Sequence, residues 1–333
     1  MKNRAVIMES VSNARFRECA LPELKPDQVL IRNFYTVVSA GTERAWSMDM
    51  PNAHSNFPYT PGYSGSGEVV KVGSDVTRVK VGDRVVVNWG GHQLYSVKPE
   101  NLVVIPEPVS MLDAAFAHIA SFSFNGVRKL RLEIGESAMV AGQGILGVFA
   151  LQVAALSGAV PLLAADCSPE RRAVAETLGA DAVLDPRADG YFDRIRELTG
   201  GEGVRAVVEV TGNAAALQQA LEYVAWEGRI ALLGCTRVSD VPIDFYRDIH
   251  KRGIQLFGAH TFARAKQESA PHHWTEQDDY RAFLKLVANG RMKAGALASR
   301  VVSPEKAHEV YRMLAEDPNP PLGIVFDWKQ YSD

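Results

Sequence analysis

Apolar and polar positions follow two different patterns along this chain, one before and one after about residue 115. Over roughly the first 115 residues, short β-branched runs alternate with Gly, Pro and Asp turns, a pattern typical of β-strands. We expect strands at residues 5–8, 29–34, 67–72, 84–87 and 102–105. The first part of the chain is therefore predicted to be rich in β-structure.

From Met111 the pattern changes to alternating helices and strands. Residues 111–130 have helical length and few breakers, and Ser168 is placed to cap a helix that opens at Pro169. Predicted strands at 137–140, 161–165, 182–184, 206–210 and 229–233 alternate with predicted helices at 147–156, 169–178, 191–198 and 215–223. Such a βαβ order predicts a parallel, doubly wound sheet with helices on both faces.

The last part of the chain mixes helices and strands without the regular alternation, with helices expected at 279–288 and 304–314 and a strand at 323–326. We therefore expect an α/β protein in which one domain is inserted into another. The inserted, doubly wound domain is placed at 118–259, and the β-rich domain at 1–117 and 260–333.

Composition narrows the class of protein. The chain has 333 residues, 47% apolar and 23% charged, with a formal net charge of −3. Two globular domains fit that length, and the charge gives no sequence-wide attraction for nucleic acid or an anionic membrane. The longest apolar run, 159–165, is too short to span a bilayer.

The chain has three cysteines, and none of them forms a CxxC pair. Their spacing gives no disulfide framework and no four-cysteine zinc site, which favours a reducing, cytoplasmic setting.

A glycine-rich motif gives the clearest functional signal. Gly142-Gln143-Gly144-Ile145-Leu146-Gly147 follows a predicted strand and opens an apolar helix. Glycines at this spacing permit a tight turn, close approach of the backbone to a pyrophosphate, and close packing of helix on strand. The helix N-terminus would then face the phosphates of a dinucleotide.

Asp166 stands at the end of the next predicted strand. A carboxylate there accepts hydrogen bonds from ribose hydroxyls and repels a 2′-phosphate, which predicts NAD rather than NADP. Arg171 and Arg172 follow closely and could accommodate a 2′-phosphate, so they weaken the preference.

With these residues the whole chain resembles the medium-chain dehydrogenase/reductase superfamily, the fold of the zinc alcohol and polyol dehydrogenases. Besides the glycine motif and Asp166, the resemblance rests on Ala40-Gly41-Thr42-Glu43, Pro61-Gly62-Tyr63-Ser64-Gly65-Ser66-Gly67-Glu68-Val69, Val81-Gly82-Asp83-Arg84-Val85, Leu178-Gly179-Ala180-Asp181, Val208-Glu209-Val210-Thr211-Gly212 and Leu232-Leu233-Gly234. It implies a GroES-like catalytic domain, a Rossmann domain and a cleft between them. It also implies cofactor contacts at Thr211 and Gly234, and dimers or larger assemblies.

The zinc members of that family carry ligands that this chain lacks. Ala40 stands in the place of the cysteine, and Tyr63 and Ser64 replace the His-Glu pair. The remaining ligand position falls near Ala117, with His118 beside it. One histidine cannot supply the three or four ligands that zinc needs, so we expect a metal-free protein.

Without a metal, another donor must meet the charge that develops on the substrate oxygen. Tyr63 is the first candidate for the acid, because it occupies a former ligand position, although it could instead only fill the space. His118 and Thr42 are the next candidates. We expect Glu43 to pair locally with Arg44.

The other histidines are weaker candidates. We expect His54 and His92 to be solvated. His260 could line the substrate site, and the segment 271–274 could cap a substrate or pack at an interface.

Together these features favour a zinc-independent, NAD(H)-dependent dehydrogenase of a secondary alcohol, such as a sugar or cyclitol. The alternatives are a zinc-free enoyl or quinone reductase and a non-catalytic dinucleotide-binding protein. A homodimer is expected, because the apolar strand at 229–233 and the residues after it would leave an unpaired sheet edge.

Overall fold

The computed structural model describes residues 2–331, which form two compact units. The β-rich unit comprises Met1–Ile119 and Gln277–Asp333, and the parallel-sheet unit comprises Ala120–Glu276. The chain thus leaves the β-rich unit and returns to it. Residues 260–276, which the sequence had assigned to the β-rich domain, cluster with the parallel-sheet unit.

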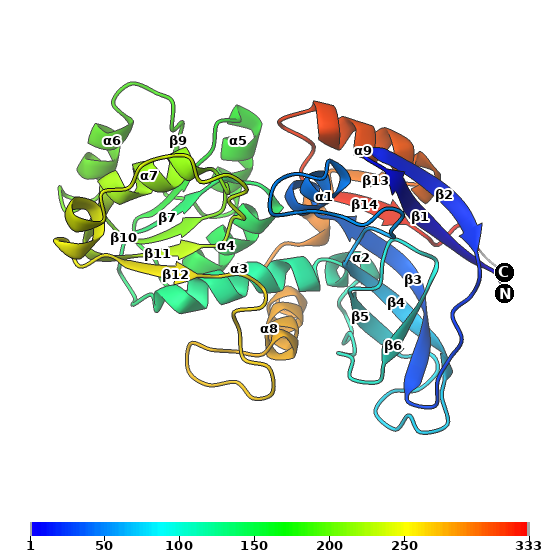
Figure 1. Cartoon of the computed structure of the whole chain (residues 1–333). Coiled ribbons are helices and arrows are strands. Elements are labelled where there is room, and N and C mark those ends of the chain that lie inside the picture. Colours follow the sequence, from blue (N-terminus) through cyan, green and yellow to red (C-terminus); the bar gives the residue numbers. More distant parts are fainter. Residues whose placement is uncertain (1, 332–333) are drawn as a thin grey trace. The chain divides into compact units, whose positions relative to one another are not determined.

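Two sheets build the β-rich unit (Figure 1). A two-stranded sheet pairs β1 (Asn3–Ser10) with β2 (Asn13–Cys19). In the second sheet the order is β13-β14-β3-β4-β5, and β6 also pairs with β3. Its strands are β3 (Gln28–Val38), β4 (Ser64–Val72), β5 (Arg84–Asn88), β6 (Tyr95–Pro99), β13 (Arg300–Val302) and β14 (Ile324–Asp327).

The long strand β3 organises this second sheet. It pairs antiparallel with β4 along one edge and with β6 and then β14 along the other. The C-terminal strand β14 therefore completes a sheet that begins near the N-terminus, which explains why both ends of the chain belong to one unit.

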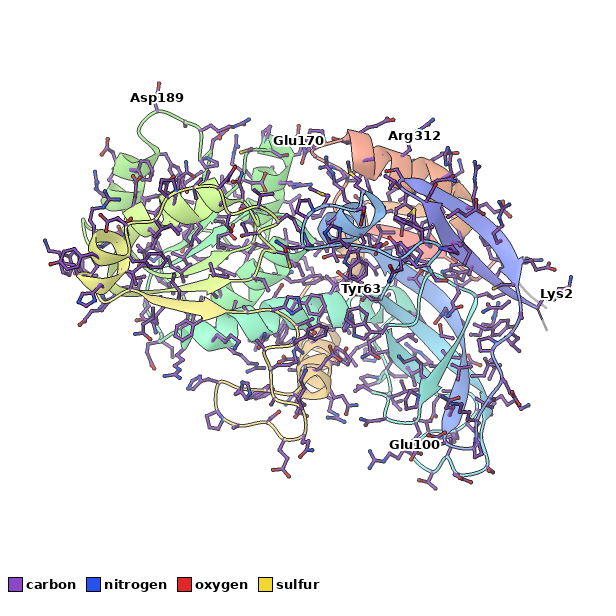
Figure 2. All side chains as sticks on the ribbon, viewed as in Figure 1. Lys2, Tyr63, Glu100, Glu170, Asp189 and Arg312 are labelled. Carbon is purple, nitrogen blue, oxygen red and sulfur yellow. The ribbon has the colours of Figure 1, made fainter. Side chains whose placement is uncertain are left out.

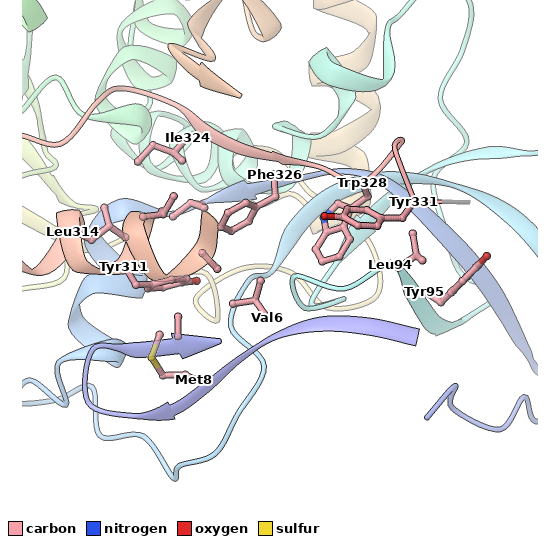
Figure 3. Close-up of a cluster of buried hydrophobic side chains, with 14 of the residues drawn as sticks. Val6, Met8, Leu94, Tyr95, Tyr311, Leu314, Ile324, Phe326, Trp328 and Tyr331 are labelled. Carbon is pink, nitrogen blue, oxygen red and sulfur yellow. The ribbon is translucent and has the colours of Figure 1, made fainter. Parts of the chain in front are cut away.

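Helices α1 (Ala40–Ser47), α2 (Met111–Ala114), α8 (Glu276–Ala288) and α9 (Ala307–Glu316) accompany these sheets. Short 3₁₀ turns occupy Gly295–Leu297 and Pro304–Lys306. A large hydrophobic core includes Met8 of β1, Tyr311 of α9, Phe326 of β14 and Trp328 (Figure 3). All four side chains are fully buried, so this core joins elements from both ends of the chain.

The parallel-sheet unit contains six strands in the order β12-β11-β10-β7-β8-β9, and every neighbouring pair is parallel. The strands are β7 (Ala138–Ala141), β8 (Leu162–Ala165), β9 (Ala182–Leu184), β10 (Val204–Glu209), β11 (Val224–Leu232) and β12 (Gln255–Gly258). The order reverses at β7, which is the topological switch point of a doubly wound fold. The predicted fold class is confirmed.

Helices cover both faces of this parallel sheet. They are α3 (Ala117–Leu130), α4 (Ile145–Leu156), α5 (Pro169–Thr177), α6 (Tyr191–Leu198) and α7 (Ala214–Tyr223), with a π-helical turn at Phe245–His250. Figure 1 shows α6 and α7 on one face and α3 and α4 on the other. Helix α4 is buried along most of its length, as its apolar sequence predicts.

Three sequence predictions are wrong in detail. Residues 102–105 form no strand, and only Val104 bridges to Val85. The helix expected at 111–130 is divided, because α2 ends at Ala114 and α3 begins at Ala117. The third prediction put the sheet edge at 229–233 and the residues after it; β12, which lies in those later residues, pairs with β11 and takes the edge position, so only the strand at 229–233 is not an edge.

Within residues 2–331, no helix combines the length and the apolar character needed to cross a bilayer.

Candidate active site and cofactor site

The glycine motif forms the turn between β7 and α4 in the parallel-sheet unit. Gly142 has φ 94°, a left-handed conformation that favours glycine. A Cβ on Gly147 would lie 1.9 Å from the Gly142 carbonyl oxygen, so only glycine lets α4 approach the turn. These two glycines therefore shape the turn itself.

Gly144 differs from the other two glycines. It is the N-cap residue of α4, and a Cβ added there would meet no atom within 4 Å. The backbone N–H groups of the first helical turn have no intrahelical partner, and they carry the positive end of the helix dipole. Open space at the N-terminus of a buried helix fits the pyrophosphate of a dinucleotide.

Asp166 lies directly after β8, beside this turn. Its carboxylate accepts hydrogen bonds from the backbone N–H of Gln143 at 2.7 Å and of Ser168 at 2.8 Å. The carboxylate is therefore fixed next to the glycine turn, where the sequence placed the adenosine ribose.

Three arginines surround Asp166. The Arg171 guanidinium lies 4.0 Å from the Asp166 carboxylate. Arg172 donates to the carbonyl oxygens of Asp166 and Cys167 and to Asp185, while Arg187 also binds Asp185. Hydrogen bonds from Arg187 hold the pKa of the Asp185 carboxyl well below its ordinary value. Arg172 and Arg187 thus share one carboxylate, that of Asp185.

Thr211 and Gly234 lie at the carboxyl ends of β10 and β11. A Cβ on Gly142 would lie 2.9 Å from Thr211 Cγ2, and one on Gly234 would lie 2.3 Å from the Gly212 nitrogen. Glu209 accepts from the Thr211 N–H and hydroxyl, and burial raises the pKa of its carboxyl. The predicted cofactor residues therefore lie at the carboxyl ends of neighbouring strands in the parallel sheet.

Tyr63 belongs to a cluster of aromatic rings in the β-rich unit. Its ring centroid is 5.9 Å from Trp46, 5.1 Å from Trp89 and 5.5 Å from His118. Tyr63 is 3% exposed, whereas Trp89 is 43% exposed and has φ 50°. Tyr63 is labelled in Figure 2, where all described side chains are drawn.

His118 is the second residue of α3 and is fully buried. Its Nδ1 lies 2.5 Å from the hydroxyl of Tyr280, on α8. Tyr280 was not singled out from the sequence, because a tyrosine inside an amphipathic helix gives no sign of a distant histidine partner. The pair joins elements that are 162 positions apart in the chain.

The former ligand positions hold no metal-binding set. Ala40 opens α1, Ala117 opens α3, and the Ser64 hydroxyl donates to the Ala115 carbonyl at 2.7 Å. Among the residues that the structure describes, no three His, Cys, Asp or Glu side chains are grouped to bind a metal ion. Methyl groups and a phenol cannot replace the thiolate and imidazole ligands of zinc, so this donor set does not fit the ion.

Thr42 lies in the first turn of α1 and is half-buried, and within residues 2–331 its hydroxyl makes no hydrogen bond. The expected pairing of Glu43 with Arg44 is wrong. Glu43 is fully buried and lies 3.0 Å from His92 Nε2, while Arg44 donates to the Ala315 carbonyl. His92 is itself fully buried, so the expectation that it is solvated is also wrong.

The other histidines lie apart from the aromatic cluster. His54 is exposed, as expected. His260 belongs to the parallel-sheet unit and contacts Phe262, and partial burial together with Arg237 lowers the pKa of its imidazole. In the segment 271–274, the Trp274 ring packs against the Arg128 guanidinium.

The fold and these residues define a two-domain dehydrogenase, and comparisons with known proteins agree. The GroES-like domain of alcohol dehydrogenases matches residues 25–106, and the family described as zinc-binding dehydrogenase matches residues 146–288. An alcohol dehydrogenase of Rhizobium meliloti is 30% identical over 342 residues, covering 90% of this chain and 97% of that protein.

Two further relatives widen the comparison. D-guloside 3-dehydrogenase of Escherichia coli is 28% identical over 270 residues, covering 78% of this chain and 75% of that protein. A Sinorhizobium meliloti dehydrogenase solved with NADP bound has a TM-score of 0.84 at 21% identity, over 98% of this chain and 99% of that one.

The chain belongs to the medium-chain dehydrogenase/reductase superfamily. It is a dehydrogenase of this family, and the relatives that it resembles include an alcohol dehydrogenase and a guloside dehydrogenase.

Proposed function

We propose that this protein is a zinc-independent, NAD(H)-dependent dehydrogenase that interconverts a secondary alcohol and its ketone. The proposal is supported by Ala40, Tyr63, Ser64 and Ala117, which stand where the family resemblance places the zinc ligands, and by the ring cluster around Tyr63. A polyhydroxylated substrate such as a sugar or cyclitol is supported by the similarity to a guloside dehydrogenase.

The preference for NAD rests on Asp166. Its carboxylate is fixed beside the glycine turn and would face the 2′-oxygen of the adenosine ribose. A ribose hydroxyl can donate to this carboxylate, whereas a 2′-phosphate would meet a like charge. Arg172 and Arg187 bind Asp185, and Arg171 lies 4.0 Å from the Asp166 carboxylate, so each of the three nearby arginines already has an acidic partner.

When bound, NAD(H) would supply the hydride for reduction and would accept it in oxidation. The proton is handled by the chain. In reduction, the carbonyl π electrons move to the oxygen, and the Tyr63 hydroxyl gives that oxygen its proton. In oxidation the step runs in reverse: Tyr63 starts as the phenolate and takes the substrate O–H proton, which restores its hydroxyl. Thr42 donates a hydrogen bond to the same substrate oxygen, and His118, held by Tyr280, is the next proton carrier.

An activity panel tests the proposal. NADH oxidation is measured with ketoses, inososes, quinones and enones, and NAD reduction with the matching alcohols, before and after treatment with a chelator. We expect turnover of cyclic or open-chain ketoses, unchanged by the chelator, and less than one equivalent of zinc by metal analysis. Turnover of enones or quinones alone would favour a reductase, and NADH binding without turnover would favour a non-catalytic protein. A stoichiometric zinc whose removal abolishes activity would disprove the metal-free mechanism.

A further inference from the structure

A buried polar network in the β-rich unit connects α1 with His92 and α9. Glu43, in the first turn of α1, is fully buried and accepts three hydrogen bonds. The Ser39 N–H donates to Oε1 at 2.8 Å, His92 Nε2 lies 3.0 Å from Oε2, and the Tyr311 hydroxyl donates to Oε2. Burial and the nearby Glu43 charge raise the pKa of the Tyr311 phenol well above its ordinary value, which keeps it a donor.

His92 is held on both of its nitrogens. Nδ1 lies 2.8 Å from the Thr36 hydroxyl, and the Trp328 indole N–H donates to the same hydroxyl oxygen at 2.9 Å. Because the indole can only donate, the hydrogen of the Thr36 hydroxyl is available for Nδ1. The neutral imidazole with its proton on Nε2 then satisfies Glu43 and Thr36 together.

The same imidazole also contacts the segment that carries Tyr63. Gly62 has φ 95°, and a Cβ there would lie 2.6 Å from the His92 ring. Backbone hydrogen bonds tie the two segments together: His92 N donates to the Pro61 carbonyl at 2.6 Å and Trp89 N to the Tyr63 carbonyl at 2.9 Å. His92 therefore lies between Glu43, which neighbours Thr42, and Gly62, which neighbours Tyr63.

We propose that Glu43 and His92 form a positioning pair, which fixes α1 and the Gly62–Tyr63 segment relative to each other. The proposal rests on the proposed function, in which the hydroxyls of Thr42 and Tyr63 act on one substrate oxygen. Neither Glu43 nor His92 needs to touch the substrate. Their contribution is to hold two hydroxyls from separate elements at a constant separation, on which proton transfer depends steeply.

Glycine substitutions give a matched pair of variants. Gly62→Ala introduces a methyl group against the His92 ring, and it carries the strain of a left-handed alanine. Gly82→Ala is the control, because Gly82 has nearly the same φ, 92°, but no atom lies within 4 Å of its added Cβ. Both variants therefore place an alanine at nearly the same positive φ, and only Gly62→Ala also brings a methyl group against the imidazole.

Histidine substitutions complete the series. His92→Ala removes the imidazole, and His92→Gln keeps a side-chain amide donor for Glu43 as the conservative variant. Gly62→Ala combined with His92→Ala tests whether the methyl group acts through the ring. In that background Gly62→Ala should lower the melting temperature less than it does in the wild type, because the clash is absent.

Two readouts separate positioning from folding. We expect Gly62→Ala and His92→Ala to lower kcat by about 10- to 100-fold with the Kd for NADH unchanged, while Gly82→Ala keeps kcat. His92→Gln should recover part of kcat. With 5-fluorotryptophan incorporated at the five tryptophans, the ¹⁹F signal of Trp89, whose ring is 5.1 Å from Tyr63, should shift in Gly62→Ala and His92→Ala. The signals of Trp226 and Trp274, in the parallel-sheet unit, should not shift.

Folded His92→Ala protein with wild-type kcat, or an unshifted Trp89 signal in both Gly62→Ala and His92→Ala, would overturn the positioning role. Equal effects of Gly62→Ala and Gly82→Ala would do the same, because backbone strain alone would then explain them. If wild-type protein turns over none of the panel substrates, the proposed function fails, and the ¹⁹F signals still decide whether His92 positions the Tyr63 segment.

Discussion

Gly144 and Gly147 allow cofactor binding to be separated from folding by two single methyl groups. Gly144 has φ −69°, which alanine adopts without strain, and the added Cβ would meet nothing within 4 Å. Gly144→Ala should therefore cost at most about 1 kcal/mol of stability, the effect of alanine at a helix N-cap. The methyl group would nevertheless occupy the space in which we place the pyrophosphate.

Gly147→Ala should behave differently. Its Cβ would lie 1.9 Å from the Gly142 carbonyl oxygen, well inside any normal contact. Helix α4 would have to move away from the turn, and overpacking of this kind costs about 1–3 kcal/mol. For a domain of this size, that corresponds to a melting temperature lower by about 2–12 °C.

Calorimetric titration with NADH and thermal unfolding of each variant test both expectations. Gly144→Ala should weaken NADH binding by about 10- to 100-fold, which corresponds to one charge-assisted hydrogen bond at the phosphates. Its melting temperature should stay close to that of the wild type. Folded Gly144→Ala protein that binds NADH as tightly as wild type would show that the pyrophosphate does not lie at this turn.

Three further predictions concern the proton donor, the ribose site and acid stability. Tyr63→Phe should lower kcat by about 10²–10⁴-fold with NADH affinity intact. If Tyr63→Phe keeps normal kcat while His118→Ala loses it, His118 and not Tyr63 is the main proton donor. Asp166→Ala should weaken NADH binding by about 1–3 kcal/mol and reduce the difference in affinity between NADH and NADPH, as fluorescence titration would show. Tighter binding of NADPH than of NADH by the wild type would contradict the NAD assignment. Hydrogen bonds from Arg187 lower the pKa of Asp185, so its contribution to stability is present above its ordinary pKa and is lost as the pH falls below that value. Asp185→Asn should make the acid-induced decrease in melting temperature between pH 7 and pH 3 shallower than in wild type, and an identical decrease would contradict this.

The architecture was predictable because it depends on local patterns. The change from short β-branched runs to a βαβ order is visible in the sequence, and the strands β7 to β11 fall within a few residues of their predicted places. The β12 strand was missed because Gln255–Gly258 is short and only partly buried, so it shows little apolar periodicity. Because β12 was missed, the predicted edge included the strand at 229–233 as well as the residues after it.

The cofactor turn could be found from spacing, whereas the surroundings of Tyr63 could not. Glycines near one another in the sequence shape a single turn, so the geometry of that turn can be inferred from their spacing alone. His118 and Tyr280, or Glu43 and His92, meet only through the tertiary fold. His92 stands in a turn-rich segment, which normally indicates exposure, and nothing local shows that β3, α1 and Trp328 enclose it.

The exchange of zinc ligands for other side chains raises the question of what keeps the three former ligand segments in place. In a zinc site the metal itself fixes its ligands. In the zinc-independent enzyme that we propose, hydrogen bonds would have that role. The Ser64 hydroxyl donates to the Ala115 carbonyl just before α3, and the Glu43–His92 pair connects α1 with the segment before Tyr63. Rings of Trp46, Trp89 and His118 pack around Tyr63 in the position of a metal ligand. In the metal-free protein that we propose, hydrogen bonds and ring packing supply the order that a metal would otherwise give, so removal of metal ions should leave its melting temperature unchanged.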